Sequence, residues 1–170
     1  LHPRVQLMFS GRYDAYTRTS RRGTDPQVHF AQNPFTYRAA LNVQVLSNFS
    51  LYTSYGTTYE AQTSLAPTGA TLDPQSGWQY EFGARLAFFQ NRLTVDASAY
   101  RLVEKNIVVF RTIDVFDQNG QASSDGFEVE VHGRASRRLT MFANYGFTRA
   151  RFDDFISDGT DISGNVLPFA

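Results

Sequence analysis

The residues whose chemistry is easiest to name are the aspartates near the end of the chain. Asp153, Asp154, Asp158 and Asp161 would supply carboxylate oxygens, the ligand type that calcium prefers. The run lacks the spacing and the glycine of an EF-hand loop, so the other interpretation is a solvated loop. We expect the solvated loop and no metal site.

Other reactive groups are scattered along the chain. There is no cysteine, and the three histidines (His2, His29 and His132) lack the short spacing typical of zinc ligands. The run Ser123-Ser124-Asp125 has no identifiable general base beside it in the sequence. The sequence therefore predicts no catalytic residue, no bound cofactor and no enzyme activity.

Charge and hydrophobicity exclude two further classes. Lys plus Arg and Asp plus Glu number 16 each, so the formal net charge is zero. A general nucleic-acid binder needs a basic face, and we expect no nucleic-acid partner. The longest apolar runs, such as residues 107–110, are too short for a transmembrane helix, although membrane β-strands need no such run.

The dominant period is two, which is typical of β-strands with one apolar and one polar face. The pattern predicts an all-β chain, an antiparallel meander of seven strands. The strands begin at Val5, Phe35, Phe49, Trp78, Leu93, Gly126 and Leu139 and end near Tyr16, Leu46, Glu60, Phe88, Ala99, His132 and Thr148. The fifth loses its alternation between Arg101 and Asn106.

Strand and connection lengths favour a membrane barrel. Most of the strands are about 11–15 residues long, whereas globular strands usually have about 5–6 and a tilted membrane strand needs about 9–11. Short turns are predicted at 46–48, 90–92 and 134–138, and long links at 19–34, 61–77, 112–125 and from 153 onward. All long links would then lie at one end, as in outer-membrane barrels.

The covering of the apolar face distinguishes this interpretation from a soluble all-β module. A soluble sandwich would pack Phe9, Leu41, Phe82, Val95 and Val129 against a second sheet, whereas a barrel would turn them to lipid. Aromatic residues on this face could form interfacial girdles, or simply reflect the preference of aromatics for strands. They are Phe9, Tyr13, Phe35, Phe49, Tyr55, Tyr59, Trp78, Tyr80, Phe88 and Phe147.

Charged residues on the opposite face would line the lumen. They are Arg12, Arg38, Glu81, Arg85, Glu128 and Glu130, and the arginines could pair with the glutamates. A lumen position avoids the cost of about 2–4 kcal/mol for Arg or Lys at the bilayer midplane. These charges are either barrel-wall structure or a part of a substrate path.

Four stretches together resemble the carboxy-terminal half of the TonB-dependent siderophore receptor family. Residues 48–56 (NFSLYTSYG) are similar to the motif N-x-S-L-Y-x-S-Y. Residues 72–83 (LDPQSGWQYEFG) are similar to L-x-P-E-x-G-x-Q-Y-E-x-G, and Gln75 stands where the family often has an acidic residue. Residues 120–131 (GQASSDGFEVEV) resemble G-x-x-x-S-x-G-x-E-x-E. Residues 139–150 (LTMFANYGFTRA) resemble L-x-x-x-x-x-Y-x-Y-T-x-A, with Phe147 at the second tyrosine. The tail at 164–168 resembles the loop before the next barrel strand.

The resemblance implies a partial transmembrane β-barrel, with residues 1–170 supplying about seven of 22 strands around a plug. The plug, the TonB-interacting segment and the closing strand would lie outside these residues. It implies TonB-dependent uptake of a ferric siderophore across a Gram-negative outer membrane, with lipid and lipopolysaccharide as neighbours. Cobalamin, haem or a glycan are the alternative ligands.

Within that resemblance, the first long link could contact the ligand. Arg18, Arg21, Arg22 and Phe30 could hold an anionic ferric chelate through charge and stacking. The alternatives are a mixed surface loop or arginines that bind lipopolysaccharide phosphate.

Overall fold

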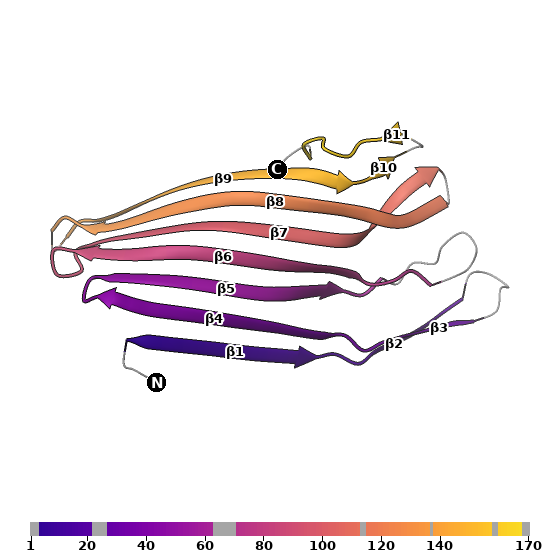
Figure 1. Cartoon of the computed structure of the whole chain (residues 1–170), viewed down its shortest axis with the longest axis horizontal. Helices are drawn as coiled ribbons and strands as arrows, with labels where there is room; N and C mark the ends of the chain where they lie inside the picture. The colour runs from indigo at the N-terminus through magenta and orange to yellow at the C-terminus, as the bar shows by residue number, and fades with distance from the viewer. Residues whose placement is uncertain are drawn as a thin grey trace.

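The computed structural model is all-β, and one antiparallel sheet of seven strands makes up most of it (Figure 1). It describes residues 4–21, 27–62, 71–112, 115–136, 138–157 and 160–167. The predicted fold class is therefore confirmed.

The sheet follows the chain in order, apart from one hairpin inserted after the first strand. Its order is β1-β4-β5-β6-β7-β8-β9. The strands are β1 (Val5–Tyr13), β4 (Phe35–Leu46), β5 (Phe49–Glu60), β6 (Gln75–Phe88), β7 (Leu93–Thr112), β8 (Val115–Arg134) and β9 (Thr140–Asp154). A meander of this kind brings each strand beside its neighbour in sequence, so the register follows from the turns.

The inserted hairpin, β2 (Tyr16–Ser20) with β3 (Val28–Gln32), corrects the predicted first strand and first long link. The strand ends at Tyr13 rather than near Tyr16, and much of the link is β-structure. The break lies where the N–H of Asp14 donates to the carbonyl of Pro34 at 3.1 Å. Proline lacks a donor, so the main ladder cannot run through it unchanged.

The turns β4–β5, β6–β7 and β8–β9 lie at one end of the sheet, and the connections that follow β1, β5 and β7 lie at the other (Figure 1). We call these the turn end and the loop end. At the β6–β7 turn, Phe89, Gln90 and Asn91 have φ of 53°, 58° and 64°. This left-handed conformation reverses the chain one residue earlier than the predicted segment 90–92.

The predicted link at 112–125 is wrong, because β7 and β8 continue as a ladder as far as the pair Thr112 and Val115. Its polar sequence shows no alternation, so the pattern did not indicate that the two strands continue there. The irregularity between Arg101 and Asn106 also has a cause. Asn106 has φ 60° at a register shift, and its side-chain amide donates to the Pro74 carbonyl at 3.1 Å.

The sheet is a single layer over most of its area. We call the side of Leu41, Phe82 and Val129 the apolar face, and the side of Glu81, Ser98 and Glu128 the polar face. On the apolar face Phe9 is 73% exposed and Phe82 is 52% exposed. Among the described residues no second sheet covers this face, which contradicts the packing that a soluble sandwich requires.

The last described segments return along the edge of β9. β10 (Ile156–Ser157) pairs with β11 (Thr160–Asp161), and Val166 then bridges Arg151 in antiparallel orientation. The N–H of Leu167 donates to the carbonyl of Ala150 at 2.9 Å. The tail thus starts a further antiparallel pairing, as expected of a loop leading to a next strand. Of the residues described, none lies in a helix that could cross a membrane.

Candidate functional site

The strand registers bring the predicted charges together on the polar face. Glu81 lies opposite Ser54, and Glu128 lies between Ser98 and Gly146 on the neighbouring strands. Arg85 and Glu130 share this face by the same alternation, as do Arg12 and Arg38 toward the other edge. Whether these charged residues belong to the structure of a barrel wall or to a substrate path stays a prediction.

Their ion-pair partners differ from the predicted ones. Arg85 pairs with Asp96 at 2.5 Å, Arg12 pairs with Asp14 at 2.7 Å, and Glu130 contacts His132. No described arginine or lysine forms an ion pair with Glu81 or Glu128. This part of the polar face therefore presents two carboxylates that have no ion-pair partner among the described arginines and lysines.

A polar cavity of about 540 Å³ lies at the loop end, between the β1–β2 link and the end of β5. Its lining includes Arg12, Asp14, Tyr16 and Glu60. Both Nε and Nη2 of Arg12 donate to Asp14 Oδ1, at 2.9 and 2.7 Å, which fixes the guanidinium at the cavity wall. Such a lining can hydrogen-bond an oxygen-rich ligand.

One hydrogen bond ties the hairpin to the sheet beside this cavity. The hydroxyl of Tyr59 donates to Gln32 Oε1 at 2.5 Å. We predict that Tyr59→Phe loses about 1 kcal/mol of local stability, the usual net value of such a bond. Trypsin should then cleave the hairpin about fivefold faster, while Tyr145→Phe on β9 should leave the cleavage rate unchanged. Equal rates in both variants would show that this bond does not hold the hairpin.

The predicted ligand-contact residues separate into two groups. Arg18 and Arg21 are exposed at the loop end, whereas Phe30, opposite Arg18 in the hairpin, is only 2% exposed. The predicted ligand contact of Phe30 requires an accessible ring. The ring is buried in this structure and offers no surface to a ligand that arrives from solvent. Arg22 lies outside the described residues, as do His2 and Asp158.

Aromatic side chains form a continuous band on the apolar face. The ring centroids of Phe35 and Tyr37 are 6.3 Å apart, those of Tyr37 and Tyr55 5.9 Å, and those of Tyr55 and Trp78 6.3 Å. The band crosses β4, β5 and β6 toward the loop end. Aromatics gathered at one level fit an interfacial girdle better than a general strand preference.

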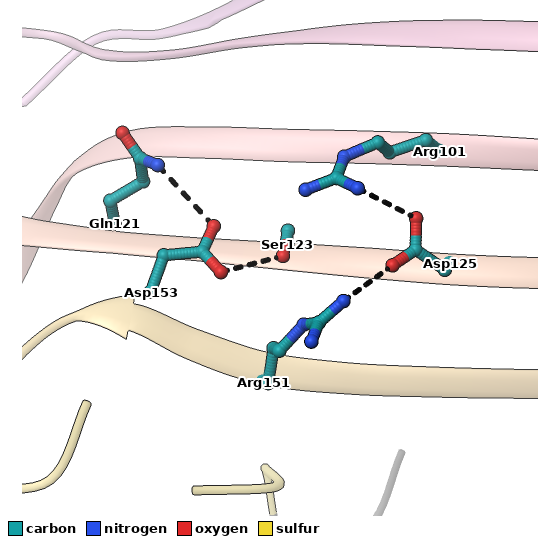
Figure 2. A network of polar contacts seen from close by, with 6 residues as sticks. All are labelled: Arg101, Gln121, Ser123, Asp125, Arg151 and Asp153. Atoms are coloured by element: carbon teal, nitrogen blue, oxygen red, sulfur yellow. Dashed lines mark hydrogen bonds and ion pairs between the residues drawn. The ribbon is translucent and has the colours of Figure 1, made fainter. Parts of the chain in front are cut away.

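Beyond the aromatic residues of β8 and β9, the apolar face carries a network of polar side chains. Figure 2 shows its members, which are Arg101, Gln121, Ser123, Asp125, Arg151 and Asp153. Asp125 accepts from Arg151 at 3.0 Å and lies 3.4 Å from Arg101. Asp153 accepts from the hydroxyl of Ser123 at 2.8 Å and from Gln121 at 3.3 Å. Ser123 is 2% exposed, so this bond satisfies a buried hydroxyl.

Two of the aspartates near the end of the chain, Asp153 and Asp161, accept hydrogen bonds from neighbouring residues. Within the described residues, no group of three or more acidic or histidine side chains could hold a metal ion. Hydrogen bonds from the Ser163 hydroxyl and its backbone N–H hold the pKa of Asp161 below its ordinary value of 3.8. The resulting stabilisation is present above pH 4 and is lost as the pH falls through the folded-state pKa.

We therefore predict that acid loosens the turn after Asp161. Hydrogen exchange of the segment 160–167, corrected for intrinsic rates, should speed up when the pH falls from 5 to below 3. Asp161→Asn has no carboxylate to titrate and should show no such pH dependence. The same acceleration in Asp161→Asn would assign the effect to another group.

Comparison with known proteins gives one consistent family. The family model "TonB dependent receptor-like, beta-barrel" matches residues 1–170. The chain is 29% identical over 164 residues to the ferrioxamine receptor of Yersinia enterocolitica, covering 95% of this chain and 23% of that protein. It is 24% identical over 122 residues to a probable TonB-dependent siderophore receptor, PiuA, of Acinetobacter baumannii. That match covers 66% of this chain and 16% of that protein.

Solved structures share the fold. The alcaligin outer-membrane receptor FauA of Bordetella pertussis superposes with a TM-score of 0.75 at 19% identity, over 99% of this chain and 29% of that chain. The pyoverdine receptor FpvA of Pseudomonas aeruginosa superposes with a TM-score of 0.74 at 19% identity, over 96% of this chain and 24% of that chain. The chain thus spans less than a third of the length of these proteins.

Proposed function

Since the chain belongs to the TonB-dependent receptor-like β-barrel family, we propose that it forms part of the wall of a transporter for ferric siderophores. The family places the barrel in the outer membrane of a Gram-negative bacterium. The observation that carries the proposal is the seven-stranded antiparallel sheet with one uncovered apolar face and one charged face. Every backbone group in hydrocarbon needs a partner, so such a sheet must continue into a closed barrel.

We propose that residues 1–170 supply about seven of 22 strands in a larger chain. A plug and a TonB-interacting segment would belong to other parts of that chain. The curated relatives, of which this chain matches 16% and 23%, leave room for both. The carboxylates of Glu81 and Glu128, which form no ion pair with a described arginine or lysine, face the side on which a plug would lie.

In this arrangement the loop end faces the cell exterior and captures the ligand. Arg18 and Arg21 would attract an anionic chelate, and the cavity beside Arg12 offers further donors. Energy from the inner membrane, transmitted by TonB to the plug, would then open a path along the polar face. The chain's own residues act by binding and by forming the wall, and we propose no enzymatic step.

The test uses the full-length receptor in a strain that lacks its chromosomal copy. Growth and uptake of radiolabelled iron should be restored for one class of ferric siderophore and should require TonB. Arg18→Gln with Arg21→Gln should lower ligand affinity, whereas Arg92→Gln, an exposed cation at the turn end, should not. Failure of every ferric chelate, together with uptake of cobalamin, haem or a glycan, would reject the siderophore assignment.

A further inference from the structure

A side-chain amide joins two connections at the loop end that are far apart in the sequence. We call residues 71–74, which precede β6, the link segment, and residues 105–112 of β7 with 115–120 of β8 the ribbon. Gln118 of the ribbon accepts a hydrogen bond from the backbone N–H of Asp73 at 2.6 Å, and its amide donates back to the Asp73 carbonyl. This side chain therefore pairs with both backbone groups of Asp73, as a neighbouring strand would.

A second amide of the ribbon, that of Asn106, holds the next residue of the link segment. Its Nδ2 donates to the carbonyl of Pro74 at 3.1 Å, and Gln118 also donates to the carbonyl of Asn106 at 3.2 Å. Three backbone groups of the link segment are thus bound by side chains of the ribbon. Because these bonds go to backbone atoms, they depend on the two amides and not on the exposed side chain of Asp73.

The ribbon bends at the level of these amides. Asn106 has φ 60°, and the register of β7 and β8 shifts between Glu104 and Ile107 and again before Val109. A bulge of this kind bends a strand pair and interrupts its ladder. In Figure 1 the loop-end part of β7 turns away from the line of the rest of the strand. Since a broken ladder holds its direction less firmly, the bulge is a point at which the ribbon can pivot.

The base of the ribbon packs against the corner that follows β9. A Cβ at Gly120 would lie 2.8 Å from the ring of Phe155 and 3.0 Å from the Cβ of Ile107, so the backbone and the ring are already in close contact. Phe155 in turn packs on Phe152, with ring centroids 4.2 Å apart. Apolar packing thus fixes the base of the ribbon, whereas hydrogen bonds of the two amides hold it to the link segment.

We propose that Gln118 and Asn106 form a latch that joins the link segment to the ribbon, so that the two connections move as one unit about the bulge. With the latch closed, the link segment maintains the bend of the ribbon. With the latch open, the ribbon pivots independently of β6. The inference goes beyond the proposed function, because it requires no particular ligand.

Hydrogen exchange and one spin-label distance test the latch in the full-length receptor in phospholipid vesicles. Gln118→Glu keeps the shape of the side chain but, at neutral pH, turns a carboxylate toward two carbonyls. Exchange of the Asp73 N–H should become about tenfold faster, as expected when a local hydrogen-bonded contact opens. The distances between spin labels at the exposed positions Thr71 and Lys105 should become more widely distributed.

Asn106→Asp is the second variant. Aspartate also tolerates a positive φ, but it cannot donate to the carbonyl of Pro74, so both readouts should change in the same direction. Asp73→Asn is the matched control, because it exchanges an acid and an amide on a side chain outside the latch. Gln121→Ala removes a nearby amide that binds Asp153 instead, and both controls should behave as the wild type does.

Two results would overturn the proposal. They are wild-type exchange and distances in Gln118→Glu, and changes in Asp73→Asn as large as those in Gln118→Glu. Slow exchange of the backbone amides within β6 shows that the barrel is folded in every variant. Neither readout uses a ligand, so a failure of the siderophore assignment would leave both results unchanged.

Discussion

Replacing Phe82 by arginine should destabilise the membrane-inserted receptor by about 2–4 kcal/mol, the cost of an arginine at the bilayer midplane. Phe82 lies near the middle of the apolar face of β6, which runs from Trp78 to Phe88. Ten residues at about 3.3 Å each, tilted by about 40°, span about 25 Å, which is the height of the apolar band of such barrels. The side chain would therefore have no aqueous layer within easy reach.

Ser54→Arg is the matched control for this variant. Ser54 lies on the polar face directly opposite Glu81, so the new guanidinium would meet a carboxylate. Urea unfolding in phospholipid vesicles should show a large loss for Phe82→Arg and a change below about 1 kcal/mol for Ser54→Arg. The reverse order would mean that the two faces have been assigned to the wrong environments.

Gly126→Ala should cost about 1–3 kcal/mol, the range for overpacking a fitted site. A Cβ at Gly126 would lie 2.5 Å from the hydroxyl and ring of Tyr100 and 2.8 Å from the backbone carbonyl of Phe147. The tyrosine hydroxyl is held by Thr148 at 2.6 Å, so the ring cannot move without losing that bond. The backbone carbonyl, being part of the ladder, is harder still to displace.

Gly146→Ala is the control, on the next strand and the same face. Its Cβ would have no neighbour nearer than Glu128 Cγ at 3.6 Å, an ordinary contact. Alanine should be neutral or slightly stabilising there, because glycine weakens a strand. The same unfolding measurement compares the two variants, and equal losses would show that Tyr100 and Phe147 do not restrict position 126.

The hairpins were the most predictable part of the fold. Strands 35–46 and 49–60 were predicted with the observed bounds, because strict alternation ends at a turn on each side. A turn centred on Gln90 and Asn91 also places Arg85 opposite Asp96. The ion pair could therefore have been found from the register, whereas the pairing of arginines with glutamates was predicted from charge alone.

Features outside the bilayer were harder to predict. In the ladder of β7 and β8 toward the loop end, the polar sequence lacks the alternation that marks a strand with one apolar face, so both strands were predicted to be shorter than they are. The contact of Tyr59 with Gln32 joins strands separated by a long connection, and the burial of Phe30 depends on how the hairpin packs.

The central claim is that lipid covers the apolar face, and spin labels along β6 test it most directly. The chain contains no cysteine, so single cysteines can be introduced at each position from 79 to 88 in the full-length receptor in vesicles. Collision rates with dissolved oxygen should peak at the even positions, from Tyr80 to Phe88, and fall at the odd ones, with a period of two. Low oxygen access at the even positions, with a water-soluble nickel chelate reaching only the odd ones, would show that the apolar face packs against protein.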